Sequence, residues 1–112
     1  MPRRKRKVRR SLQPRTHEIA DSFVLRYNHV HFTESAIKHG IPEVDTRRSK
    51  NHAIKIFKFF DDLDRPRILM IGPDKSGNLL ELLMAINPDS SLKIFHAMRL
   101  RPKFVGLIND QE

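Results

Sequence analysis

The segment that most constrains the fold is an apolar run at residues 79–86, in which Glu81 is the only polar residue. Successive side chains of a strand point to opposite faces of its sheet, so this run is apolar on both faces. Such a strand needs neighbours along both edges and cover on both sides. We therefore expect it at the centre of a sheet.

Three further apolar segments predict strands around this central one: residues 54–60, 67–71 and 92–98. The connections between the four segments are short, and Gly77 supplies the positive φ that one of the turns needs. Strands joined by short turns pair antiparallel. The sequence therefore predicts a four-stranded antiparallel meander over residues 54–98.

Helical signals precede the meander. Thr33 is suited to cap a short helix over 34–39, which Gly40 can end in the left-handed conformation. Pro42 suits the first turn of a second helix that runs to about residue 52 or 53. Residues 16–31 are compatible with a helix or a strand, and we favour the helix. The predicted fold class is α+β, with two short N-terminal helices packed on one face of a four-stranded antiparallel sheet.

The charge of the chain is concentrated at its N-terminus. Eight of the 22 Lys and Arg residues lie in residues 1–15, which contain no acid, and the other 14 nearly balance the 13 Asp and Glu residues. A block of like charge repels itself and cannot build a core, so we predict a disordered basic tail over 1–15 and one domain over 16–112. The tail is either a contact with phosphate backbones or simply a solvated segment.

Composition narrows the chemistry. The chain has no Cys, which excludes thiolate ligands and thiol nucleophiles. The six His residues do not show the spacing of a metal site, so we predict no metal and no cofactor. No apolar run approaches the roughly 20 residues of a membrane helix, and no secretory signal is recognised. These features predict a cytoplasmic location.

A basic cluster follows the last predicted strand. Under strict alternation His96 shares one face with Leu92, Ile94 and Met98, either as a core-edge histidine or as an imidazole at the floor of a cleft. Three cations alternate along the next segment and would project together if the chain stays extended, as a phosphate clamp or as a solvated edge: Arg99, Arg101 and Lys103.

Two other positions are candidates for the same site. Glu81 is costly in a central strand unless it is paired, with Arg67 as the expected partner; otherwise it is a general base. Lys38 and His39 end the first predicted helix, where cations are favourable without any function or could contact a ligand.

Several blocks of sequence together resemble a known family: Lys38-His39-Gly40-Ile41-Pro42-Glu43, Arg67-Ile68-Leu69-Met70-Ile71-Gly72-Pro73-Asp74, Gly77-Asn78-Leu79-Leu80-Glu81 and His96 to Phe104. Over about residues 31–105 the chain resembles the BrnT-like toxins of bacterial type II toxin–antitoxin systems, within the RelE/ParE superfamily. It departs from better-known members in having Phe32-Thr33 before the first helix and His96-Ala97-Met98 at the end of the last strand.

The resemblance implies a compact α+β fold and a ribonuclease that arrests translation. It also implies a small antitoxin partner, often of the ribbon-helix-helix type, through which the complex contacts DNA. RNA carries its own nucleophile, the 2′-hydroxyl, so a metal-free site can suffice. In this hypothesis His96 or Glu81 is the base, Arg99 and Arg101 hold the phosphate, and the remaining candidates contact RNA: Lys38, His39, Arg67 and Lys103.

Two other classes of function remain open from the sequence. The chain could be a non-catalytic nucleic-acid-binding module, with affinity from the tail and placement from the cluster. It could also act only through protein contacts.

Overall fold

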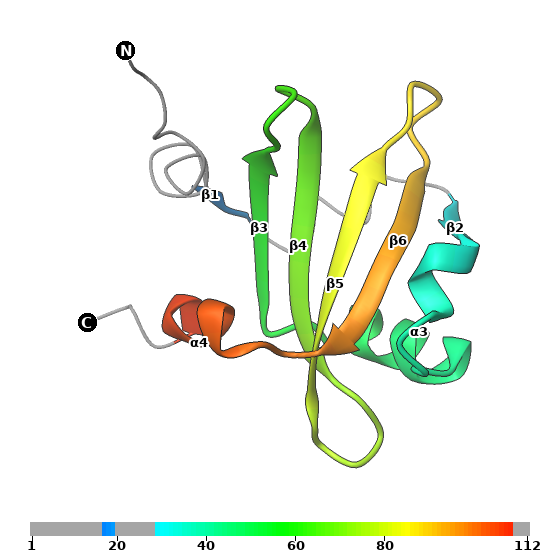
Figure 1. Cartoon of the computed structure of the whole chain (residues 1–112), viewed down its shortest axis with the longest axis vertical. Coiled ribbons are helices and arrows are strands. Elements are labelled where there is room, and N and C mark those ends of the chain that lie inside the picture. The colour runs from blue at the N-terminus through cyan, green and yellow to red at the C-terminus, as the bar shows by residue number, and fades with distance from the viewer. Residues whose placement is uncertain (1–16, 20–28, 109–112) are drawn as a thin grey trace.

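The computed structural model describes residues 17–19 and 29–108. The fold is α+β, built on one mixed sheet of six strands in the order β1-β3-β4-β5-β6-β2 (Figure 1). The predicted tail over 1–15 lies outside the described residues, as do residues 20–28 of the favoured N-terminal helix.

The four central strands form the predicted antiparallel meander: β3 (Lys55–Phe60), β4 (Pro66–Pro73), β5 (Leu79–Ile86) and β6 (Leu92–Arg99). The prediction that residues 79–86 are internal is confirmed, since β5 pairs with β4 on one edge and with β6 on the other. Gly77 ends the turn before β5 with a φ of +88°, as its position predicted.

The prediction of a four-stranded, fully antiparallel sheet is wrong, because a short strand is added at each edge. β1 (His17–Glu18) pairs antiparallel with β3, and β2 (Val30–Phe32) pairs parallel with β6. Strands of two or three residues are too short to show an alternating pattern. Their existence depends on pairing with segments distant in sequence, which local analysis does not detect.

The prediction of two helices at the N-terminal side on one face is also wrong. The first is only a 3₁₀ turn, η1 (Glu34–Ile37), before Gly40 at φ +83°. The second is confirmed as α3 (Glu43–Asn51). The other α-helix is C-terminal, α4 (Pro102–Ile108), which contradicts the extended chain expected after residue 98. Pro102 opens α4, a position where its fixed φ suits the first turn.

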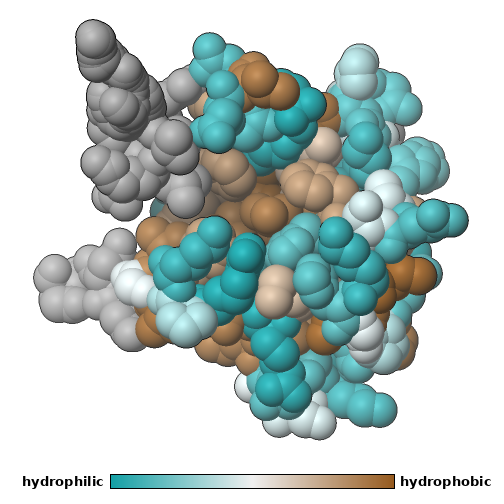
Figure 2. Space-filling view, in the orientation of Figure 1, coloured by the Kyte–Doolittle hydropathy of each residue, from teal (hydrophilic) through white to brown (hydrophobic). Residues whose placement is uncertain are grey.

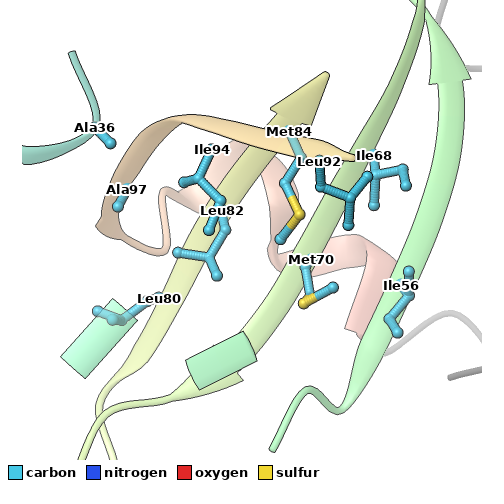
Figure 3. Packing of buried hydrophobic residues seen from close by; sticks show 10 residues of the cluster. All are labelled: Ala36, Ile56, Ile68, Met70, Leu80, Leu82, Met84, Leu92, Ile94 and Ala97. Atoms are coloured by element: carbon cyan, nitrogen blue, oxygen red, sulfur yellow. The ribbon is translucent and has the colours of Figure 1, made fainter. Parts of the chain in front are cut away.

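The two sides of the sheet are covered differently, and we name them the closed face and the open face. On the closed face, ten buried residues form the larger core under η1 and α3: Ala36, Ile56, Ile68, Met70, Leu80, Leu82, Met84, Leu92, Ile94 and Ala97. Figure 3 shows these side chains pointing from neighbouring strands into one cluster. Gly72 lets α3 approach, because an added Cβ there would collide with the carbonyl oxygen of Ser49.

The open face carries a smaller core. Phe104 of α4 packs there against Phe57, Leu69 and Ile71. The helix α4 covers only one end of this face, and no other helix of the described residues overlies the strands beyond it (Figure 1). The part of the open face beyond α4 therefore has room for a site.

Candidate functional site

A β-bulge in β6 decides the direction of His96. In the register of β5 and β6, His96 lies opposite Leu83 but Ile94 lies opposite Met84, so Phe95 is an extra residue on β6. A bulge interrupts the alternation of side chains along its strand. His96 therefore belongs to the open face, and the prediction that it shares a face with Leu92 and Ile94 is wrong.

His96 meets a fully buried carboxylate there. Glu81 of β5 has no exposed surface, and its Oε2 lies 3.0 Å from His96 Nε2. The two residues are diagonal neighbours on adjacent strands, a spacing within reach of long side chains. The same carboxylate accepts two hydrogen bonds from Arg101, from the backbone N–H to Oε1 at 2.9 Å and from Nε to Oε2 at 2.7 Å.

These partners keep Glu81 ionised. Burial of the carboxyl group opposes ionisation, but the hydrogen bonds from His96 and Arg101, together with the charge of Arg101, hold the pKa of Glu81 below its ordinary value. An ionised carboxylate only accepts hydrogen bonds, so Nε2 of His96 must carry a proton. When the ring is neutral, the lone pair then lies on Nδ1, and Nδ1 is the nitrogen that can accept a proton.

Arg101 connects this cluster to solvent. It stands between β6 and α4, and its side chain is 36% exposed while it contacts Glu81. A guanidinium has five N–H donors, and the contacts with Glu81 occupy only part of them. The expected pairing of Glu81 with Arg67 is wrong, because Arg67 contacts Asp61 instead, at 3.3 Å.

The other predicted site residues divide into two groups. The ring of His39 lies edge-on to His96 with 5.5 Å between centroids, and Lys38 precedes it in an exposed position. Lys103 of α4 lies near Arg101, since both cations approach the ring of Phe104, at 5.1 and 5.5 Å from its centroid. His39 and Lys103 are therefore brought close to His96 and Arg101, respectively.

Arg99 and Arg67 are not part of that cluster. Arg99 pairs with Leu80, whose side chain belongs to the core of the closed face, so Arg99 leaves the sheet on the far side from Glu81. The three predicted cations therefore do not project together, because the chain turns into α4 instead of staying extended. Arg67 lies on the open face but farther along the strands.

Arg67 lines a hollow that sequence analysis missed. The hollow has a volume of about 520 Å³, and its floor includes Phe59, Leu83, Ala85 and Phe95. Figure 2 shows a hydrophobic depression in the middle of this face, with hydrophilic residues around it. Its position beside His96 follows from the bulge, which sequence alternation could not reveal. The signal for this hollow that was available in the sequence is an aromatic or cationic residue on each of three strands.

Comparisons with protein-family models, with curated proteins and with solved structures give no match to this chain. Among the described residues, no helix has the length and apolar character needed to span a membrane. Within the same residues no three His, Asp or Glu side chains are grouped as metal ligands. The functional argument therefore depends on the geometry of the open face.

Proposed function

We propose that this protein is an endoribonuclease that cleaves RNA without a metal ion. The observation that carries the proposal is the hydrogen bond from His96 to the buried, ionised Glu81, beside the partly exposed Arg101. An imidazole that is oriented by a carboxylate and placed next to a fixed cation has the parts needed to transfer a proton near a phosphate.

In this mechanism His96 Nδ1 removes the proton from a 2′-hydroxyl. The 2′-oxygen attacks the adjacent phosphorus, the bond to the 5′-oxygen breaks, and the product is a 2′,3′-cyclic phosphate. The remaining donors of Arg101 stabilise the negative charge that builds on the phosphate oxygens. The 5′-oxygen leaves with a proton, which the exposed His39 beside His96 would donate.

Glu81 has a positioning role in this scheme. Its carboxylate is fully buried and its pKa is lowered, so it is a weak base that cannot reach RNA. It instead fixes the tautomer of His96 and stabilises the imidazolium that forms when His96 takes the proton. We therefore assign the proton transfer to His96 and not to Glu81.

The sequence resemblance supports the same proposal. Glu81 is 15 residues from His96 and 20 from Arg101, yet it is joined to both by hydrogen bonds in the fold. All three residues lie in the blocks that resemble BrnT-like toxins. On this basis we propose a toxin that acts on RNA in the cytoplasm and is inhibited by a small antitoxin. DNA contact would then come through the complex.

A cleavage assay on purified protein tests the proposal, with RNA in a chelator-containing buffer, with and without ribosomes. We expect cleavage by the wild type and a loss of about a hundredfold or more in turnover for His96→Ala, in the range of a lost general base. The matched control is His52→Ala, since His52 is exposed at the end of α3. Circular dichroism checks that both variants fold.

Two results contradict the nuclease proposal. Full activity of a folded His96→Ala variant removes this cluster from the mechanism. Binding of RNA without cleavage under any of these conditions favours the second candidate, a non-catalytic nucleic-acid-binding module. The hollow with its aromatic floor is the observation that favours this alternative, because it offers a binding surface without any chemistry.

A further inference from the structure

The hollow on the open face has a regular construction across four strands. Phe59, Arg67, Ala85 and Lys93 are successive register partners on β3, β4, β5 and β6, so they form one row across the sheet. All four line the hollow, together with Phe95 from the bulge. The row combines an aromatic ring, a guanidinium and an ammonium group.

Charge at the hollow is positive. Arg65, Arg67 and Lys93 line it against a single carboxylate, Asp61, which contacts Arg65 at 2.9 Å and Arg67 at 3.3 Å. Lys93 is exposed, whereas the side chain of Arg67 is only 15% exposed. The surplus of positive charge is complementary to an anion that enters from solvent.

Two aromatic rings, Phe59 and Phe95, line the hollow. The guanidinium carbon of Arg67 lies 5.6 Å from the centroid of the Phe95 ring, and Phe59 borders Arg67 on the neighbouring strand. Aromatic rings and guanidinium planes are the groups on which unpaired bases stack. The volume of about 520 Å³ lies within the roughly 300–1,000 Å³ that is usual for small-ligand sites.

The hollow is adjacent to the proposed catalytic histidine. The bulge presents two consecutive side chains on the open face, with Phe95 lining the hollow and His96 bonded to Glu81. The row of His96 is two residues along the strands from the row of Lys93, which is about 7 Å at the usual rise per residue. This spacing is comparable to that of successive phosphates in an extended RNA strand.

We propose that the hollow binds one unpaired nucleotide of an RNA strand, next to the phosphate held at His96 and Arg101. The base stacks on the surface formed by Phe59, Arg67 and Phe95, and Lys93 contacts the phosphate of that nucleotide. This inference rests on the nuclease proposal for its substrate, and it defines that substrate as single-stranded RNA. A duplex does not fit, because its bases are stacked on one another and cannot reach the floor.

A binding experiment tests this without depending on cleavage. The probe is a labelled eight-nucleotide RNA that is 2′-O-methylated and so cannot be cleaved, compared with an abasic strand of the same length and with the corresponding duplex. We expect the wild type to bind the single strand about tenfold more tightly than the abasic strand, within the range of one base–aromatic stack. We expect the duplex to bind more weakly than the single strand.

Two kinds of variant separate the base from the phosphate. Phe95→Leu should reduce the ratio of the affinities for the base-bearing and abasic strands to nearly one. Phe59→Leu, on a strand far from the bulge, should reduce this ratio as well. Lys93→Gln should weaken the base-bearing and abasic strands equally and lessen the salt dependence of binding. The control is Lys75→Gln, which changes an exposed lysine in the turn between β4 and β5.

Equal binding of the base-bearing and abasic strands by the wild type overturns the proposal. An unchanged base preference in both Phe variants, or equal binding of duplex and single strand, also overturns it. Cleavage of unmodified RNA is measured on the same samples. Base-dependent binding without cleavage would refute the nuclease proposal but support the nucleotide site in the hollow. Cleavage without base-dependent binding would support the nuclease proposal but refute the nucleotide site.

Discussion

The two faces of the sheet use the same strands for different purposes. On the closed face, alternate residues of β3, β4, β5 and β6 bury only apolar side chains under η1 and α3. On the open face, the same strands carry a buried carboxylate, a histidine and a hollow, and α4 covers only one end. Stability and candidate chemistry are therefore separated by the pleat of the sheet.

This separation has a physical basis. A buried carboxylate is unfavourable unless hydrogen bonds and an opposite charge compensate its lost hydration. On the open face, Arg101 supplies a backbone N–H, a guanidinium N–H and a positive charge to Glu81, because the chain turns into α4 at that point. A carboxylate placed in the apolar cluster of the closed face would be destabilising.

The largest effect that tests the comparison comes from two neighbouring leucines of β5. Leu82 is fully buried in the core of the closed face, whereas Leu83 is partly exposed in the hollow of the open face. We expect Leu82→Ala to lower the free energy of unfolding by about 3 kcal/mol through lost burial and a cavity. Leu83→Ala should lower it by about 1 kcal/mol, since its side chain is already partly exposed and loses less burial.

Denaturant unfolding followed by circular dichroism measures both changes. Because the residue type, the strand and the substitution are the same, the difference reports the faces alone. Equal losses of stability in the two variants would contradict the assignment of one face to stability and the other to a site.

The comparison of faces also shows how far sequence reasoning reached. The apolar run at β5 and the signals at Gly40 and Pro42 are local, and they gave the meander, the tight turn and α3 correctly. The edge strands depend on pairing with distant segments: β1 on β3, and β2 on β6. Local patterns therefore predicted the centre of the sheet but not its edges.

For the candidate site, too, local sequence patterns predicted only part of the structure. Glu81, His96 and Arg101 were recognised as unusual residues from sequence, because each interrupts or follows an apolar strand. Their association was not predictable, because the bulge at Phe95 reverses the direction of His96 and because the chain turns sharply after Leu100. Without these two backbone features, His96 would point into the closed face and Arg101 would project with Arg99.

Two arginines on opposite sides of the sheet allow the closed face and the open face to be compared in their effect on activity. Arg101→Lys keeps the charge beside Glu81 but loses the planar, multi-donor contact, so we expect turnover on RNA to fall by about tenfold with little change in KM. Arg99→Lys changes an exposed residue that leaves the sheet on the far side, and turnover should remain within about twofold of the wild type. Steady-state cleavage kinetics give both values.

If Arg99→Lys reduces turnover as strongly as Arg101→Lys, the phosphate does not lie on the open face. If both variants are fully active, neither arginine contacts the scissile phosphate. Arg99 is exposed, so we expect Arg99→Lys to fold like the wild type, and thermal unfolding of both variants checks this directly.

The smallest expected effect concerns the pH dependence of stability through Glu81. Its pKa is lower in the folded protein than in the unfolded chain, so at acidic pH the unfolded state takes up the proton first. The contribution of Glu81 to stability is therefore fully present above its unfolded pKa of about 4.3 and is lost as the pH falls through the folded pKa.

Glu81→Gln is nearly isosteric but cannot ionise, so it should be less stable than the wild type at pH 7, and the difference in stability should narrow toward pH 3. Comparing the wild type with this variant cancels the contributions of other acids with lowered pKa values, such as Asp61 and Asp74. Urea unfolding at a series of pH values measures the difference, with Glu43→Gln on the exposed surface of α3 as the control. A difference that stays constant from pH 7 to pH 3 would show that Glu81 titrates alike in both states, and the buried ion pair with Arg101 would then not be what distinguishes the open face.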